Sequence, residues 1–230
     1  MLQYLGPKLE IDVMQASELN EAMELAFVYR MPAIVVHPDL VADAVLQRVK
    51  RQATYRIITT VDWPKGEKVG VTKFHSMSVR ALSCDGFEIM LGSRSRGEIK
   101  AEMLSITEFV RRHLPEVREI RFVLGCLSRG PATIEDICMA MREVPAPDFL
   151  RTDINLRAQQ AKASITAHTE TLALIKKCIN RPVKLCGNIN SAKALVSCKA
   201  ERYGVSLKQA QGIIKELRDN PKKVEKYLAK

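Results

Sequence analysis

Stretches typical of β-strands alternate with stretches typical of α-helices eight times along this sequence. The strand-like stretches are short apolar runs, and the helix-like stretches carry apolar residues at helical spacing. This alternation in one undivided chain is typical of a parallel sheet, because each strand needs a crossover helix before the next. At 230 residues, an α/β fold of the closed (β/α)8 TIM-barrel type accommodates all eight units. The alternative, an open doubly wound sheet, is disfavoured because no Gly-x-Gly-x-x-Gly motif follows the first strand-like stretch.

The same pattern predicts where each element lies. We expect a single barrel over residues 1–206, followed by a basic helical tail over residues 207–230 that packs on the barrel. Ser17 is expected to cap the first long helix. The expected strands are residues 9–14, 31–37, 55–61, 86–91, 120–125, 148–153, 182–187 and 202–206. The expected helices are residues 16–29, 39–50, 73–83, 97–113, 133–144, 166–179, 190–198 and most of 207–230.

The net charge of +10 favours anionic partners. These are a phosphosugar or phosphate, nucleic acid, or an acidic protein surface, and the charge alone does not choose among them. Aromatic residues make up 5% of the chain, so stacking platforms for single-stranded nucleic acid are scarce. Zinc-finger, RNP and P-loop patterns are absent from the sequence.

The six cysteines are scattered through apolar segments and form no Cys-x-x-Cys pair, which predicts buried thiols. They are Cys84, Cys126, Cys138, Cys178, Cys186 and Cys198. We therefore expect no disulfide framework, no metal site and no bound cofactor. No run approaches the length of a membrane span, and residues 1–30 lack the apolar core of a signal peptide. These features predict a cytoplasmic protein with no membrane partner.

Charged residues interrupt three of the predicted apolar strands. Glu88, Arg151 and Lys184 each lie inside such a run, where a charge is costly unless it is paired or faces a wet site. They indicate either a working site or a structural cluster of ion pairs. In (β/α)8 barrels the chemistry lies at the carboxyl ends of the strands. The polar residues expected there are Asp12, His37, Asp62, Glu88, Arg151, Asp153, Lys184 and Ser206, of which Asp12, His37 and Asp62 also fit turn or cap roles.

The order of several motifs over residues 9–206 resembles deoxyribose-phosphate aldolase, a class I aldolase barrel. The matching stretches are His-Pro at 37–38, Trp-Pro-Lys-Gly at 63–66, Cys-Asp-Gly-Phe-Glu at 84–88, Asp-Phe-Leu-Arg-Thr-Asp-Ile-Asn at 148–155, Lys-Leu-Cys-Gly-Asn at 184–188 and Tyr-Gly-Val-Ser at 203–206. The resemblance rests on the order and spacing of these motifs together.

The resemblance implies a Schiff-base mechanism with one residue changed at its centre. The sixth-strand lysine that serves the family as nucleophile corresponds to Arg151, the second lysine to Lys184, and the proton-transfer acid to Glu88. Asp12 is a further catalytic candidate, at the end of the first strand. A guanidinium stays protonated and is a poor nucleophile, so Arg151 cannot form the imine.

The family's phosphate-binding turns are also altered. They correspond to Gly187, Asn188, Gly204 and Ser206, and the Gly-Gly of the family is Gly187-Asn188 in this chain. Backbone amides at such turns can still hold an anion. Three loop arginines, Arg94, Arg96 and Arg129, are expected to add positive charge near the barrel mouth.

These features predict a divergent barrel that has lost Schiff-base catalysis and acts as a binding, regulatory or assembly protein. One alternative is an aldehyde or phosphosugar lyase that uses Lys184 and Glu88, in which a neighbouring Arg151 depresses the pKa of Lys184. A second alternative is a nucleic-acid-binding protein, because residues 207–230 hold seven basic and three acidic side chains. A homo-oligomer is compatible with each of these.

Overall fold

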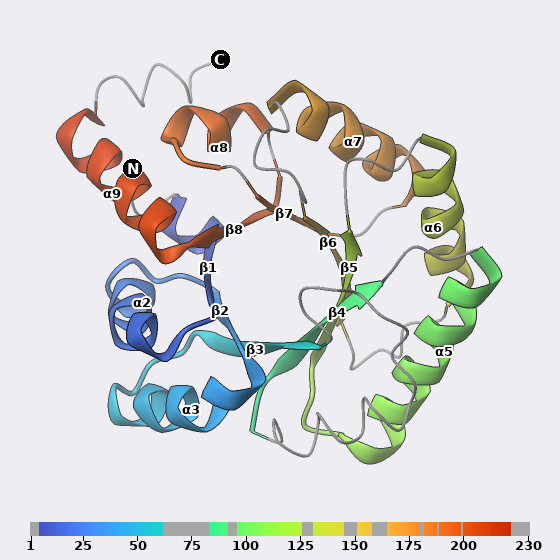
Figure 1. The fold of residues 1–230 in the computed structure, drawn as a ribbon, viewed down its shortest axis with the longest axis horizontal. Helices are drawn as coiled ribbons and strands as arrows, with labels where there is room; N and C mark the ends of the chain where they lie inside the picture. Colours follow the sequence, from blue (N-terminus) through green and yellow to red (C-terminus); the bar gives the residue numbers. More distant parts are fainter. Residues whose placement is uncertain are drawn as a thin grey trace.

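Eight parallel strands close into a barrel in the order β1-β2-β3-β4-β5-β6-β7-β8, as Figure 1 shows. The computed structural model describes residues 5–61, 83–91, 96–125, 131–144, 151–157, 165–179, 182–187, 189–198 and 200–221. The strands are β1 (Leu9–Val13), β2 (Ala33–Val36), β3 (Arg56–Val61), β4 (Gly86–Leu91), β5 (Glu119–Gly125), β6 (Arg151–Arg157), β7 (Val183–Cys186) and β8 (Arg202–Ser206). The pairing of β8 with β1 closes the ring and confirms the predicted (β/α)8 barrel.

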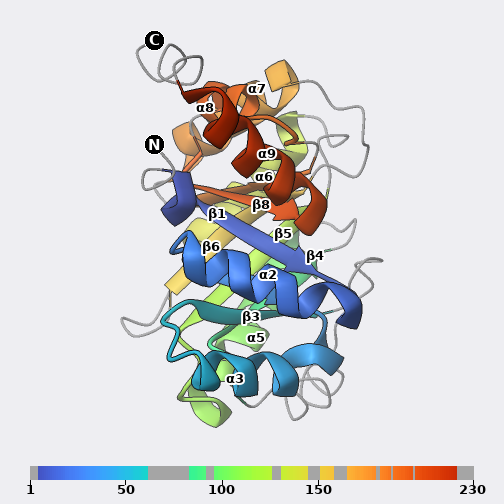
Figure 2. The same ribbon diagram turned by 90° about the vertical axis from the view of Figure 1, so that its left-hand side faces the viewer.

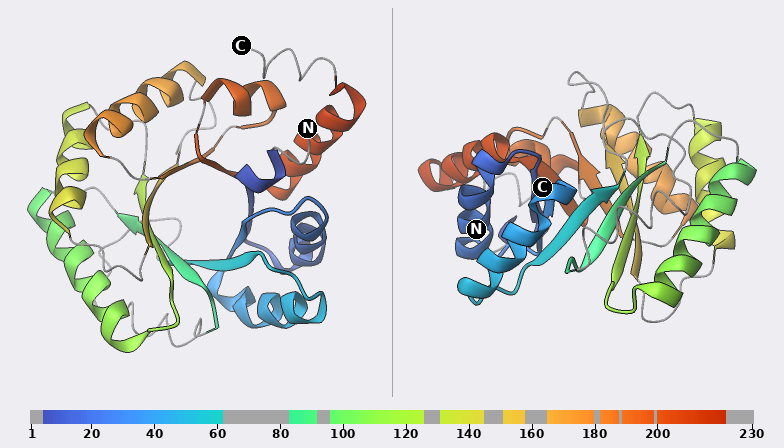
Figure 3. Two further views of the ribbon diagram at one scale, coloured as in Figure 1. Left: turned by 180° about the vertical axis from the view of Figure 1, so that it is seen from behind. Right: turned by 60° about the horizontal axis from the view of Figure 1, so that its bottom comes forward.

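Helices lie outside the ring of strands, as the views from both ends show (Figures 1 and 3). They are η1 (Gly6–Lys8), α2 (Ala16–Val28), η2 (Pro38–Leu40), α3 (Val41–Lys50), α5 (Arg96–His113), α6 (Pro131–Glu143), α7 (Ile165–Cys178), α8 (Ala192–Cys198) and α9 (Leu207–Asp219). The helix expected over residues 73–83 lies outside the described residues. Within the described part of the chain, no helix has the length and apolar character needed to cross a membrane.

Two local predictions were wrong. The sixth strand, expected over residues 148–153, runs from Arg151 to Arg157, and its ladder with β5 continues to the pair Gly125 and Arg157. Polar residues at alternate positions resemble a loop in sequence, but they suit a barrel strand. The helix α2 begins at Ala16 after an extended Gln15, so Ser17 lies inside the helix and does not cap it.

The barrel has a large apolar core between strands and helices and a smaller one inside the ring. Ile11, Ile34 and Ile57 represent the first, in which strand residues pack against the surrounding helices. Inside the ring, Ala33, Val35 and Ile58 form a separate apolar cluster on β2 and β3. Alternation along each strand separates these two sets, because successive side chains point to opposite faces.

The helix α9 closes the ring of helices next to β1 and β8. It buries Leu207, Ala210, Ile213, Ile214 and Leu217. Its start is fixed by a capping box: Ser206 Oγ accepts from the Gln209 amide, and Gln209 Oε1 accepts from the Ser206 amide. The start of the helix that follows β8 is therefore determined by local hydrogen bonds.

Two residues with positive φ end the helices α2 and α3. Arg30 has φ 53° and Gln52 has φ 51°, a conformation that costs a residue with a Cβ about 1–2 kcal/mol. We expect Arg30→Gly and Gln52→Gly each to raise the free energy of unfolding by about 0.5–1 kcal/mol. Urea denaturation measures this change. The control Lys50→Gly, inside α3, should lower it by about 1 kcal/mol, and destabilisation by all three substitutions would contradict the account.

Candidate functional site

Charged side chains fill much of the barrel interior. They come from β1, β3, β4, β5, β7 and β8 and contact one another across the ring. We call this set the barrel network: Glu10, Asp12, Arg56, Glu88, Glu119, Arg121, Lys184 and Arg202. Its described members are four acids and four bases. This balance follows the rule that buried charges need partners of opposite sign.

Arg121 is the centre of the network and is fully buried. It donates from Nε to Glu119 Oε1 at 2.7 Å and from Nη1 to Glu88 Oε1 at 2.8 Å. It also contacts both carboxylate oxygens of Glu10. Burial alone lowers the pKa of Arg121, but Glu10, Glu119 and Glu88 raise it well above the ordinary value. Arg121 is therefore a permanent cation shared by three carboxylates.

Lys184, on β7, is held by three carboxylates. Its Nζ lies 2.8 Å from Glu88 Oε1, 3.2 Å from Asp12 Oδ1 and 3.2 Å from Glu10 Oε2, and the residue is 2% exposed. Burial alone lowers the pKa of Lys184, but the negative charges around it, that of Asp12 foremost, raise it well above the ordinary lysine value. Lys184 is thus protonated at neutral pH. The lyase alternative requires a lowered pKa of Lys184, so that the amine is neutral and can attack a carbonyl.

Glu119 joins the network at the start of β5. It contacts Arg56 and accepts from Arg202 Nη1 at 2.9 Å, in addition to its bond with Arg121. Burial alone raises the pKa of Glu119, but the charges of Arg121 and Arg56 lower it to about 2. The pKa of Glu10 is lowered in the same way, with Arg121 the main source after the opposing effect of burial. Both carboxylates are therefore ionised across the physiological range.

The structure brings together three of the four predicted catalytic residues: Asp12, Glu88 and Lys184. Sequence reasoning missed the other five members of the network, Glu10, Arg56, Glu119, Arg121 and Arg202. A signal existed in the sequence, because charged residues recur at alternate positions in β1 and β5. Alternation of this kind places the charged residues of β1 and β5 on one face of each strand, which is the inner face of the barrel.

Arg151, the fourth predicted catalytic residue, is the first residue of β6, where its backbone pairs with Glu119. Of β6 the structure describes the backbone. The β6 residue in register with Lys184 is Asn155, four positions further along the strand. Arg151 and Lys184, which were expected to be neighbours, are therefore not opposite each other on β6 and β7. No residue of β6 is a lysine, so this strand offers no amine next to Lys184.

Two of the predicted anion-binding residues, Gly187 and Ser206, lie at the carboxyl ends of β7 and β8, whereas Gly204 lies in the middle of β8. Gly187 has φ 132°, and its carbonyl accepts from Gln209 Nε2 at 3.1 Å, which ties this turn to the start of α9. Ser206 caps α9 with its side chain. Gly204 faces the side chains of Lys184 and Cys186 inside the ring. Asn188 lies outside the described residues.

Other predicted positions have local roles or lie outside the described residues. His37 Nδ1 accepts from the Asp39 amide at 3.4 Å, so this residue caps the short helix η2 that follows the strand. The positions outside the description are Asp62, Arg94 and Arg129, and only the backbone of Arg96 and Asp153 is described.

The cysteines that the structure describes are free thiols. Cys84, Cys138, Cys186 and Cys198 are buried, whereas Cys178 is half-buried and Cys126 lies outside the description. Burial raises the pKa of Cys84 to about 12, which disfavours the thiolate form. Among the described residues, no three His, Cys, Asp or Glu side chains are placed to share a metal ion.

Gly204 makes room for Lys184 inside the barrel. A Cβ at this position would lie 2.5 Å from Lys184 Cε and would also collide with Cys186 Sγ. We expect Gly204→Ala to lower the free energy of unfolding by about 1–3 kcal/mol, because a packed interior resists added volume. The matched control is Gly212→Ala in α9, where nothing lies within 4 Å, and it should stabilise by about 1 kcal/mol. Equal effects in denaturant titrations would contradict this role of Gly204.

The network predicts a loss of stability in acid. Because the pKa of Glu119 falls from 4.5 to about 2 on folding, its contribution is complete above pH 4.5 and is lost as the pH falls toward 2. We expect the free energy of unfolding to decline across this window and Glu119→Gln to flatten the decline. Urea titrations at a series of pH values test this. The exposed Glu108→Gln should leave the slope unchanged, and an unchanged slope in Glu119→Gln would count against the prediction.

No family model matches the sequence, and no curated protein matches it. Solved structures do match. The deoxyribose phosphate aldolase of Aeropyrum pernix, described as a tetramer, superposes with a TM-score of 0.77 at 12% identity, covering 95% of this chain and 92% of that one.

Two further structures agree. A putative deoxyribose-phosphate aldolase from Coccidioides immitis has a TM-score of 0.73 at 13% identity and covers 95% of this chain and 87% of its own. One from Toxoplasma gondii has a TM-score of 0.67 at 17% identity, with coverage of 95% and 93%. The chain therefore has the fold of the deoxyribose-phosphate aldolases, at 12–17% sequence identity to these three structures.

Proposed function

We propose that this protein is an aldolase-type barrel that has lost Schiff-base catalysis and serves as a binding, regulatory or assembly component. The observation that carries the proposal is the position of Lys184, whose Nζ lies within 3.2 Å of three carboxylates. In this position the lysine completes a network of buried ion pairs.

Imine formation needs a neutral amine, because the nitrogen lone pair attacks the substrate carbonyl. An ammonium has no such lone pair. If Lys184 lost its proton, Glu10, Asp12 and Glu88 would have one cation fewer near them in the buried interior. The negative charges of these carboxylates therefore raise the pKa of Lys184. The arginines of β6, Arg151 and Arg157, remain protonated at any physiological pH.

The test measures cleavage of deoxyribose 5-phosphate. A coupled assay detects the acetaldehyde that cleavage releases. The matched variant is Lys184→Arg, which keeps the positive charge of the network and cannot form an imine. We expect the wild-type protein and the variant to be equally inactive. Cleavage by the wild type that the variant abolishes would overturn the proposal.

The second candidate function is an aldehyde or phosphosugar lyase. The 2.8 Å contact between Lys184 Nζ and Glu88 Oε1 favours it, because a lysine beside an acid is the arrangement that a retro-aldol reaction uses for proton transfer. In this case activity would rise steeply toward alkaline pH, where Lys184 begins to lose its proton. If no activity is detected at any pH up to the highest at which the protein stays folded, this candidate is excluded.

An anionic ligand at the carboxyl ends of β7 and β8 is part of the proposal. Gly187 and Ser206 lie at these ends, connected through Gln209, and the chain carries a net charge of +10. Calorimetric titration with inorganic phosphate tests this site. For the nucleic-acid alternative, the measurement is binding of a DNA duplex at several salt concentrations, where a steep loss of affinity with salt would support it.

A further inference from the structure

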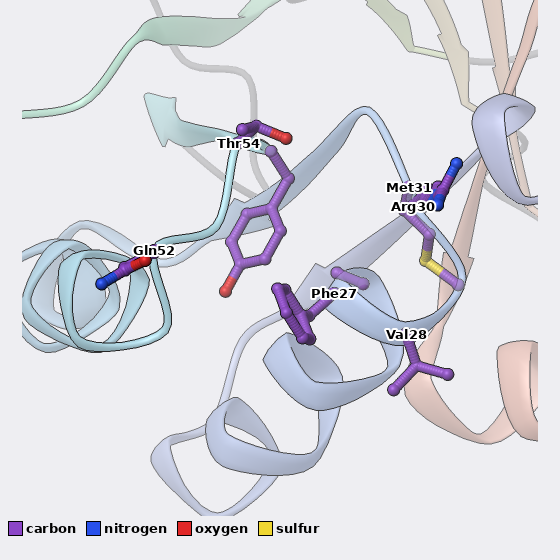
Figure 4. Close-up of a pocket in the computed structure, with 8 residues that line it drawn as sticks. Phe27, Val28, Arg30, Met31, Gln52 and Thr54 are labelled. Carbon is purple, nitrogen blue, oxygen red and sulfur yellow. The ribbon is translucent and has the colours of Figure 1, made fainter.

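A hollow of about 620 Å3 lies where the chain enters β2 and β3, at the amino ends of these strands. It is next to the C-terminal ends of α2 and α3, two helices that lie side by side (Figure 2). In Figure 4, Gln52 lies on one side of the hollow and Arg30 on the other, with Phe27 between them. A volume of this size suits a small molecule. None of the described residues that line the hollow belongs to the barrel network.

Both of the described non-glycine residues with a positive φ line this hollow. They are Arg30, with φ 53°, and Gln52, with φ 51°. Each follows the end of a helix, where glycine is the favourable residue for this conformation. Unfavourable backbone conformations of this kind gather at binding sites, where the side chain has a use that offsets the lost stability. The coincidence of two such residues at one hollow therefore indicates a ligand for their side chains.

The wall of the hollow also holds a buried hydroxyl. Tyr55 is 4% exposed, and its Oη forms no hydrogen bond within the part of the chain that the structure describes. Native proteins rarely leave a buried hydroxyl unpaired, because its lost contact with water is not replaced. A bound molecule with an acceptor atom would pair with it. The ligand reaches Oη when an exposed neighbour such as Phe27 changes its rotamer.

Arg30 supplies a positive charge that no other part of the described chain uses. Its side chain is exposed and forms no ion pair with any described residue. The two other arginines near Tyr55 already have carboxylate partners, Arg48 with Asp85 and Arg51 with Glu24. A single planar guanidinium matches a carboxylate through two parallel hydrogen bonds. A phosphate site more often combines several cations or backbone amides, so the single cation favours a carboxylate.

We propose that this hollow binds a small carboxylic acid with an aromatic body. Arg30 pairs with the carboxylate, and the apolar side chains of Phe27 and Met31 contact the aromatic body. Gln52 and the Tyr55 hydroxyl form hydrogen bonds with a polar group at the far end of the ligand. This inference goes beyond the loss of catalysis, because these residues take no part in it.

The experiment is a calorimetric titration of the full-length protein with two probes. One is para-coumarate, which has a carboxylate, an aromatic ring and a phenolic hydroxyl, and the other is phenylacetate, which lacks the hydroxyl. The neutral amide of para-coumarate is the control ligand. The test variants are Arg30→Gly and Tyr55→Phe, and the control variant is Arg112→Gln, which removes an exposed arginine from α5. Thermal unfolding of each protein without ligand is measured alongside.

We expect para-coumarate to bind with a millimolar or tighter dissociation constant, which Arg30→Gly weakens by about 10-fold or more and Tyr55→Phe by about 3-fold or more. Tyr55→Phe should weaken phenylacetate less. Both test variants should also unfold at a higher temperature than the wild type. Arg30→Gly relieves the unfavourable φ, and Tyr55→Phe removes the unpaired hydroxyl. A gain of stability combined with a loss of affinity is not expected of residues with a merely structural role.

Three results would overturn the proposal. The first is that neither carboxylate binds to the wild-type protein. The second is that the amide binds as tightly as para-coumarate, or that Arg112→Gln weakens binding as much as Arg30→Gly. The third is that Arg30→Gly or Tyr55→Phe leaves the affinity for para-coumarate unchanged.

Discussion

Replacing Arg121 by methionine is expected to lower the free energy of unfolding by about 3–5 kcal/mol, enough to unfold much of the protein at physiological temperature. The fully buried guanidinium pairs with Glu10, Glu88 and Glu119, and its loss leaves three buried carboxylates short of a cation. The methionine keeps most of the side-chain volume, so the effect reports lost charge more than a cavity. Urea denaturation measures it.

The control is Arg112→Met. Arg112 forms an exposed pair with Glu108 one helical turn away, and both side chains are more than half exposed. Such a surface pair contributes about 0–1 kcal/mol, so this variant should behave almost as the wild type. A second variant, Arg121→Met with Glu10→Gln, removes one buried negative charge as well and should recover part of the loss. A stable Arg121→Met protein would show that the network is not structural.

Replacing Lys184 by methionine has the second large expected effect, a loss of about 3–5 kcal/mol. The reason is the same: Glu88 and Asp12 lie 2.8 and 3.2 Å from the ammonium and remain buried without it. The substitution Lys184→Arg keeps a cation and should cost much less. Comparing the stabilities of Lys184→Met and Lys184→Arg shows whether the positive charge at this position is what the buried carboxylates require.

The matched control for Lys184→Met is Lys100→Met, because Lys100 pairs with Glu143 at the surface. We expect a change within about 1 kcal/mol there. If Lys184→Met were as stable as the wild type, the three carboxylates would not need its charge, and the structural interpretation of the network would be wrong.

Much of the fold was predictable from local pattern. The fourth strand and the eighth strand begin and end where the sequence predicted, at Gly86–Leu91 and Arg202–Ser206. Runs of apolar residues with strand or helix periodicity are local properties, and a chain of eight such units has few ways to bury them. The end of β6 was harder, because Asp153, Asn155 and Arg157 resemble a loop until the neighbouring strand is known.

The candidate site was predictable in part. Asp12, Glu88 and Lys184 meet inside the ring, as expected for charged residues that interrupt the apolar strands of a barrel. Glu88 and Lys184 nevertheless lie in the first half of β4 and β7, not at the carboxyl ends where the sequence placed them. The partners of Arg121 were not predictable, because Glu10 lies 111 residues away in sequence and meets it only across the closed ring. The direction of the Lys184 pKa shift depends on this geometry. A cation on β6 would have lowered it, and the three carboxylates raise it.

Reductive trapping tests the central claim most directly. The protein is incubated with acetaldehyde or deoxyribose 5-phosphate, reduced with borohydride, and mapped by mass spectrometry, with Lys184→Arg as the control. The account predicts no adduct on Lys184 at neutral pH, because the ammonium is held among Asp12, Glu88 and Glu10. An adduct on Lys184 that the control lacks would contradict it and would identify the barrel as a working aldolase.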